Sequence, residues 1–138
     1  MSKDRAIQLR VQAILEKLGA TNIALTTDAF PVSPSSELHQ KQRTCRGDYS
    51  AIYNEKRLAG EVIIGKQTGL SLLRDRCQIG GIVKNYDIPT VAGPINVKIE
   101  IIEYLKVNFD LEIFGVLGND DEICIWHIRR GLKSNSNS

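Results

Sequence analysis

Residues 47–66 read GDYSAIYNEKRLAGEVIIGK, and this stretch decides the predicted fold. Two runs rich in β-branched and aromatic residues, 49–53 and 58–64, flank a short polar segment. This pattern predicts a β-hairpin, because such residues favour strands and polar clusters favour turns. The hairpin carries two acids, Asp48 and Glu61, and their spacing makes them the candidate chemical site of the chain.

The two acids can cooperate only if the turn of the hairpin puts them on one face of the sheet. With a turn of two residues, 55–56, or of four, 54–57, Asp48 lies opposite Ile63. Asp48 and Glu61 are then diagonal neighbours on one face, with Cβ atoms roughly 7–8 Å apart. A turn of three or five residues would move Glu61 to the other face. An even turn therefore predicts a carboxylate pair able to share one divalent cation.

The composition is typical of one globular domain. The chain has 138 residues, of which 42% are hydrophobic and 25% charged, so we expect a single domain over residues 1–133. No apolar run approaches the roughly 18 residues that cross a bilayer, and the N-terminus has no apolar signal core. We therefore expect no membrane partner and a cytoplasmic location. The net charge of +2 does not indicate nucleic acid, but residues 41–76 hold eight basic and four acidic residues.

The three cysteines, Cys45, Cys77 and Cys124, do not form a Cys-x-x-Cys pair and leave one thiol over. This usage predicts that the chain has no disulfide framework. We interpret Cys77 and Cys124 as small core residues.

The segment before the hairpin begins with a helix and continues as a polar loop. Apolar residues from Ile7 to Leu18 recur with helical spacing, and Ser2 and Gly19 are suited to begin and end this helix. A short strand is expected at 22–26. Residues 27–46 are polar and lack periodicity, which favours disorder over a functional loop.

The same loop also has a functional interpretation, because three of its basic residues lie next to the acids in the sequence. Lys41, Arg43 and Arg46 lead directly into Asp48. In this interpretation the loop is a mobile basic arm whose cations contact the phosphates of a nucleic acid.

After the hairpin, Thr68 can begin a second helix with an apolar stripe. Gly80 and Gly81 interrupt the pattern, and each costs about 1 kcal/mol relative to alanine in a helix. The helix is therefore expected to end or bend at these glycines. Residues 87–92 predict a short strand, and Pro89 assigns it to a sheet edge or to the start of a strand.

The last part of the chain gives one ambiguous segment and one clear hairpin. Residues 95–107 fit either a strand or a helix, and their length favours the helix. Residues 111–117 and 122–128 flank a Gly-Asn-Asp-Asp turn and predict a second hairpin. The composition of residues 134–138 predicts a disordered tail.

This order of elements, together with Asp48 and Glu61, resembles the PD-(D/E)xK superfamily of restriction-endonuclease-like nucleases. The resemblance implies an α+β fold with a mixed sheet and two β-hairpins flanked by about three helices. It also implies that Asp48 and Glu61 bind Mg²⁺ for phosphodiester hydrolysis. Members of the family carry a lysine two residues after the second acid, and here Ile63 stands at that position. Lys66 is the candidate replacement, and Gly47 stands where the family usually has proline.

Two other functions stay open on the residues alone. One is a non-catalytic α+β interaction or regulatory module that binds a protein partner or a second copy of the chain. The other is a phosphate-binding domain that uses the turn 65–69 before the second helix. The nuclease interpretation itself includes a nuclease-derived domain that binds nucleic acid without cutting it.

Overall fold

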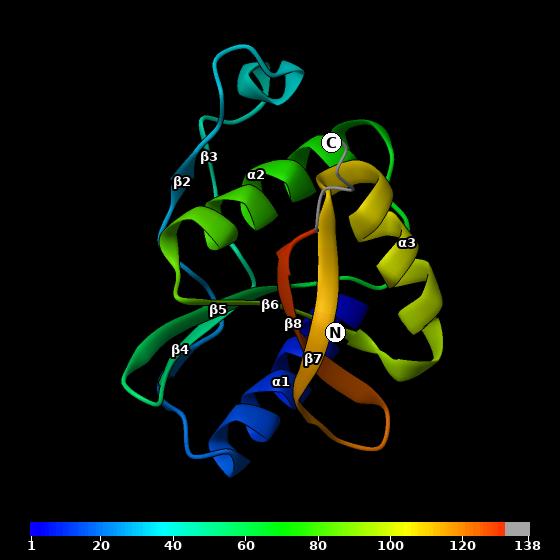
Figure 1. Cartoon of the computed structure of the whole chain (residues 1–138). Helices are drawn as coiled ribbons and strands as arrows, with labels where there is room; N and C mark the ends of the chain where they lie inside the picture. The colour runs from blue at the N-terminus through cyan, green and yellow to red at the C-terminus, as the bar shows by residue number, and fades with distance from the viewer. Residues whose placement is uncertain (132–138) are drawn as a thin grey trace, which may run out of the picture.

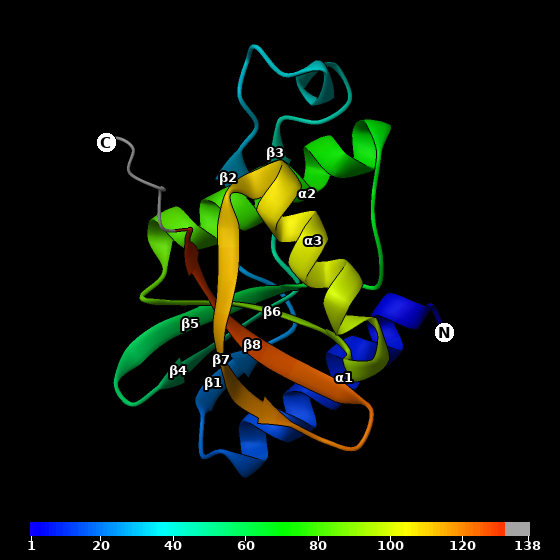
Figure 2. The ribbon, with the colours of Figure 1, turned by 45° about the vertical axis from the view of Figure 1, so that its right-hand side comes forward.

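The computed structural model describes residues 1–131, which form an α+β domain built on one mixed sheet. Six strands lie in the order β1-β4-β5-β6-β8-β7, and only β5 and β6 are parallel neighbours. Helix α1 covers one face of the sheet, and helices α2 and α3 cover the other (Figures 1 and 2). The helices are α1 Lys3–Lys17, α2 Gly69–Asn85 and α3 Lys98–Phe109, and the sheet strands are β1 Thr21–Ala24, β4 Tyr49–Tyr53, β5 Lys56–Val62, β6 Ile88–Pro94, β7 Leu111–Asn119 and β8 Ile123–Arg130.

Two apolar layers hold the helices against the sheet. Alternate residues of β8 face opposite sides: Ile125 contacts the layer under α1, whereas Trp126 belongs to the layer under α2 and α3. The predicted α1 is confirmed, because the side chain of Ser2 accepts the N–H of Arg5 and Gly19 has a left-handed φ of 87°. No helix among residues 1–131 has the length and apolar character needed to cross a membrane.

The hairpin of β4 and β5 has a two-residue turn, one position earlier than predicted. Asn54 and Glu55 form the turn with φ angles of 51° and 65°, and Tyr53 pairs with Lys56. Asparagine tolerates positive φ, which suits the tight turns that match the twist of hairpin strands. The predicted register was therefore wrong in detail. Ser50 pairs with Ala59, so Asp48 lies opposite Glu61 and not opposite Ile63. The turn is even, so the acids keep a common face.

Residues 27–46, here called the arm, have regular structure, in contrast to the disorder that the sequence favoured. The arm contains β2 Phe30–Pro31, the 3-10 helix η1 Glu37–Gln40 and β3 Thr44–Cys45. Strands β2 and β3 pair antiparallel and lie over α2 (Figure 1). The mobility that the functional interpretation gave to the arm stays a prediction.

A disulfide joins the arm to α2, and the expectation of no disulfide was wrong. Cys45 of β3 bonds to Cys77 of α2 across a sequence separation of 32 residues. Cys77 does pack, half-buried, against an apolar cluster as interpreted, but as a disulfide-bonded residue, whereas Cys124 is a buried free cysteine as expected. The pairing depends on the arm folding back over α2, which residue spacing does not reveal.

Helix α2 continues to Asn85 through both glycines, where the sequence predicted an end or a bend. A Cβ atom on Gly81 would lie 2.3 Å from Cγ of Phe30, so this glycine makes room for the arm. A Cβ atom on Gly80 would meet nothing within 4 Å. Packing therefore explains Gly81 but not Gly80.

The two glycines are expected to respond to alanine with opposite signs. Gly81→Ala should lower the free energy of unfolding by about 1–3 kcal/mol, because the new methyl group overlaps the buried Phe30 ring. Gly80→Ala should raise it by about 0.5–1 kcal/mol, because alanine is the better helix former and has free space. Urea denaturation of the two variants measures both effects. Destabilisation by Gly80→Ala would contradict the open space beside this residue.

The remaining elements agree with the sequence with one correction. Residues 95–107 are helical as favoured, in the 3-10 helix η2 Ile95–Val97 and in α3, and the second hairpin is confirmed as β7 and β8. Strand β6 is an interior strand, so the sheet-edge assignment of Pro89 was wrong and the strand-start assignment holds. The predicted tail at 134–138 lies outside the described residues.

Candidate functional site

Asp48 and Glu61 lie opposite each other across the hairpin and line one cavity of about 210 Å³. The N–H of Asp48 donates to the carbonyl of Gly60 at 2.9 Å, which extends the ladder one residue beyond β4. Its Oδ2 accepts the N–H of Val62 at 2.8 Å. The sequence correctly predicted that the two acids share a face, because this depends only on an even turn.

The backbone before Asp48 is fixed by contacts that require glycine. The N–H of Gly47 donates to Oγ1 of Thr27 at 2.7 Å. A Cβ atom on Gly47 would lie 2.8 Å from both Ile82 and Thr27. Proline has neither the N–H nor room for its ring, so the proline that the PD-(D/E)xK nucleases usually carry before the first acid would not fit at position 47. The side-chain amide of Gln8 on α1 donates to the carbonyl of Asp48 at 2.7 Å and holds the acid from the other side.

Helix α2 supplies one wall of the cavity, which the sequence analysis missed. Ser71, Arg74, Asp75 and Gln78 all line the cavity, and their spacing of i, i+3, i+4 and i+7 places them on one side of the helix. This polar stripe, running beside an apolar one, was the available signal. Asp4, at the start of α1, lines the same cavity.

Burial raises the pKa values of the three central acids. Glu61 is 5% exposed, and its Oε1 has no hydrogen-bond partner within residues 1–131. Burial first, and then the charge of Asp48, raise the pKa of Glu61 well above its usual value. Burial also raises the pKa of Asp48, although the Val62 N–H opposes this, and raises the pKa of Asp75 to about 6. Oδ2 of Asp75 accepts the hydroxyl of Tyr104 at 2.7 Å.

The structure does not bring Lys66 to the acids. Its Nζ pairs with Glu103 of α3 at 3.2 Å, and its N–H donates to Glu100 at 3.1 Å. Ile63, at the lysine position of the family, is 3% exposed in the apolar layer under α2 and α3. The cation that lines the cavity is Arg74, whose Nε donates to Gln42 of the arm at 3.2 Å. The acids around Lys66 also make the turn 65–69 a poor phosphate site.

The three basic residues predicted on the arm do not line the cavity. Arg46 donates to the carbonyl of Thr27 at 3.0 Å, Arg43 contacts His39, and Lys41 is exposed. The arm that carries them is nevertheless attached beside the cavity. Gln42 bonds to Arg74, and the carbonyl of Arg46 accepts the Gln78 amide at 2.9 Å.

A divalent cation at this site would rest on two carboxylates. No group of three or more His, Cys, Asp or Glu side chains in the described part of the chain is arranged to hold a metal ion. Mg²⁺ commonly uses only one or two carboxylates and keeps several waters, so Asp48 and Glu61 fit this ion. The unpartnered Oε1 of Glu61 is the atom that a cation would satisfy.

Comparison with family models, with curated proteins and with solved structures finds no match for this chain. The likeness to the PD-(D/E)xK nucleases therefore stays a prediction, supported by the order of elements and by the two acids.

Proposed function

We propose that the chain holds Mg²⁺ between Asp48 and Glu61 and hydrolyses phosphodiester bonds of a nucleic acid. The observation that carries the proposal is the buried, unpartnered Oε1 of Glu61 beside a second carboxylate in a cavity. Burying a carboxyl oxygen without a partner costs free energy, and buried acids with raised pKa values concentrate at functional sites. When bound, Mg²⁺ supplies Lewis-acid polarisation of a phosphoryl oxygen.

The chain's own residues bind and orient the phosphate. Arg74 lines the cavity with a guanidinium group, which can bind a phosphate through two parallel hydrogen bonds. It is the candidate for the cationic role that the family gives to lysine. Gln78 and Ser71 add hydrogen-bond donors on the same wall. Lys41, Arg43 and Arg46 extend this set along the arm, where they would contact neighbouring phosphates.

Calorimetric titration with Mg²⁺ and Mn²⁺ tests the metal site. We expect binding by the native chain and none by Asp48→Asn or Glu61→Gln, because each removes one of two charged ligands. Glu16→Gln, which changes an exposed acid on α1, is the matched control and should bind like the native chain. Absence of binding by the native chain would refute the magnesium site.

A cleavage assay on plasmid and branched DNA tests the activity. Either cavity variant is expected to cut more than about 100-fold more slowly, because a chain that no longer binds Mg²⁺ loses the polarisation of the phosphate that the ion supplies. Arg74→Gln should slow cleavage while leaving metal binding unchanged. Metal binding without cleavage would leave a nuclease-derived domain that binds nucleic acid.

A second candidate is the non-catalytic interaction module, and the outer edge of the sheet supports it. Strand β7 is an edge strand, and its residues Phe114 and Val116 are 49% and 54% exposed. A sheet edge can accept a strand from a partner or from a second copy. Two irregularities in the register of β7 with β8 weaken this candidate, because irregular edge strands pair poorly.

A further inference from the structure

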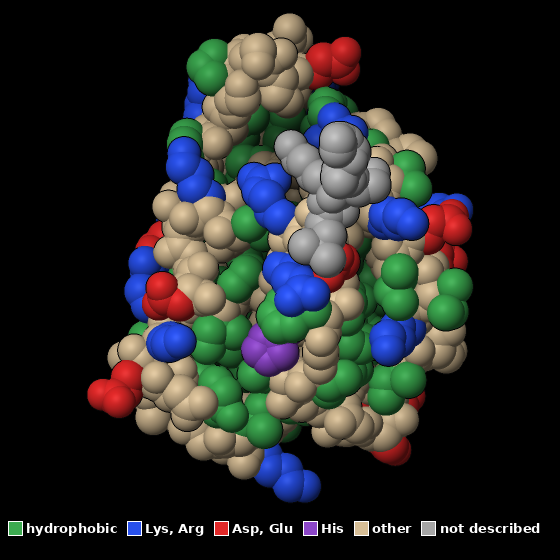
Figure 3. All heavy atoms as spheres, viewed as in Figure 1, with side chains coloured by type: hydrophobic (Ala, Val, Ile, Leu, Met, Phe, Trp, Pro, Cys, Tyr) green, Lys and Arg blue, Asp and Glu red, His purple; other side chains and the backbone are tan. Residues whose placement is uncertain are grey.

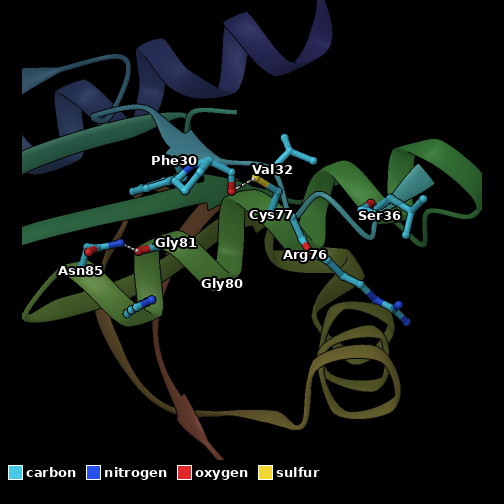
Figure 4. A pocket seen from close by; sticks show the side chains of 12 residues that line it. Phe30, Val32, Ser36, Arg76, Cys77, Gly80, Gly81 and Asn85 are labelled. Atoms are coloured by element: carbon cyan, nitrogen blue, oxygen red, sulfur yellow. Dashed lines mark hydrogen bonds between the residues drawn. The ribbon is translucent and has the colours of Figure 1, made fainter. Parts of the chain in front are cut away.

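A second cavity, of about 690 Å³, lies between the arm and the outer side of α2, and it contains none of the acids discussed above. We call it the arm groove (Figure 4). Exposed Pro31 of the arm and half-buried Leu73 of α2 give it an apolar wall, behind which Phe30 and Val32 are buried. Its polar and open parts come from Ser33, Ser36, Arg76, Gly80 and Lys84.

The charged residues of the arm groove are all cations. Arg76 and Lys84 line it, and no acid does. Neither cation forms an ion pair with another described residue. They lie eight residues apart on α2, about 12 Å along the helix axis. Figure 3 shows Lys and Arg side chains gathered over α2 and the base of the arm. The groove therefore attracts an extended anion.

Gly80 keeps the floor of the groove open. It lies four residues from each cation, so Arg76, Gly80 and Lys84 share one side of α2. A glycine inside a helix costs about 1 kcal/mol relative to alanine. Packing does not explain this cost, because a Cβ atom at Gly80 would meet nothing within 4 Å. Its effect is to let a ligand approach the helix backbone between the two cations.

An anion with apolar parts fits this groove better than a simple ion. Sites for single-stranded nucleic acids combine a cationic groove along the backbone with apolar or aromatic surface for the bases. The arm groove has both, together with the hydroxyls of Ser33 and Ser36. The wall of the acid cavity belongs to the same helix, and the arm contacts that wall through Gln42 and Arg46.

We propose that the arm groove binds an unpaired nucleotide segment of the nucleic-acid substrate, with phosphates at Arg76 and Lys84 and a base against the apolar wall. This inference rests on the proposed function and names its substrate class: a nucleic acid with a single-stranded part. A fully paired duplex would present its phosphates but keep its bases stacked, and so would leave the apolar wall without a partner.

Fluorescence anisotropy with labelled dT12, and with a blunt 12-base-pair duplex, tests the inference. The measurement is made in EDTA, so it does not depend on the metal site. We expect tighter binding of dT12 than of the duplex. Arg76→Gln and Lys84→Gln should each weaken dT12 binding about 3- to 10-fold. Each should also reduce the slope of the logarithm of the binding constant against the logarithm of the salt concentration by about one. Lys17→Gln, on exposed α1 surface, is the control and should have no such effect.

The variant Gly80→Leu distinguishes binding of dT12 in the groove from a general attraction of dT12 to surface cations. Leucine is a good helix former, and the position has free space, so the variant should fold, which circular dichroism checks. Filling the floor should weaken dT12 binding at least 10-fold, with the net charge unchanged. Native affinity in this variant, or tighter binding of the duplex, overturns the inference. Because metal titration is a separate measurement, either proposal can fail while the other holds.

Discussion

Reduction of the Cys45–Cys77 disulfide is expected to lower the free energy of unfolding by about 3–4 kcal/mol. The bond closes a loop of 32 residues, and a cross-link over that length removes chain entropy of this size from the unfolded state. Total stabilities of small domains are about 5–15 kcal/mol, so the effect is a large fraction of the whole. The disulfide also fixes the arm to α2 at Cys77, which lines the arm groove.

Urea denaturation with and without dithiothreitol measures this effect. The Cys45→Ser, Cys77→Ser double variant is the control, because the reductant should no longer change its stability. Equal midpoints for the oxidised and reduced native chain would contradict the prediction. The same comparison with dT12 should show weaker binding after reduction, since the arm loses its covalent attachment.

The protein is expected to be more stable near pH 5 than near pH 8, by about 1 kcal/mol for Asp75 alone. Its folded pKa is about 6, whereas the value without the fold is 3.8, so the folded state binds more protons between these values. Stability therefore falls as the pH rises through this window. A shift of one pKa unit corresponds to about 1.4 kcal/mol, and the partial exposure of Asp75 reduces the full amount. Glu61 acts in the same direction, because burial raises its pKa well above its usual value.

Urea denaturation at several pH values between 5 and 8 tests this trend. The side chain of His127 also titrates in this pH range, with the opposite effect on stability. Burial lowers the pKa of His127, so the neutral form favoured by the fold gains stability as the pH rises through its titration. His127→Gln removes this contribution and should steepen the fall. Asp75→Asn with Glu61→Gln should flatten it. Added Mg²⁺ should restore more stability at pH 8 than at pH 5, because it binds the ionised acids. A native chain that gains stability steadily up to pH 8 would refute the assignment.

The sequence predicted the acid pair correctly because the common face of the two acids does not depend on the exact position of the turn. Strand residues alternate between faces, so Asp48 and Glu61 share a face for any even turn, and the misplaced turn did no harm. The exact register depended on which two residues adopt positive φ, and Asn54 with Glu55 does so. The pattern alone allowed other even turns.

What the sequence missed depends on contacts between distant segments. Arg74 and Asp75 belong to the site only because of how α2 is rotated against the sheet, and the packing of Phe30 on Gly81 contributes to fixing that rotation. The disulfide likewise depends on the path of the arm. Lys66 was the candidate for the lysine of the nuclease pattern, but Glu100 and Glu103 of α3 bind it instead, and α3 comes much later in the chain.

The strand order determines when the chain can fold during its synthesis on the ribosome. Every residue that lines the acid cavity lies between Asp4 and Gln78, so all parts of the site are synthesised before β6, α3, β7 and β8. Strand β6, however, has β5 on one side and β8 on the other, and β8 supplies residues to both apolar layers. Neither layer can close until Ile123–Arg130 has emerged. The nascent chain would thus carry a complete set of site residues for some time before it has a folded site.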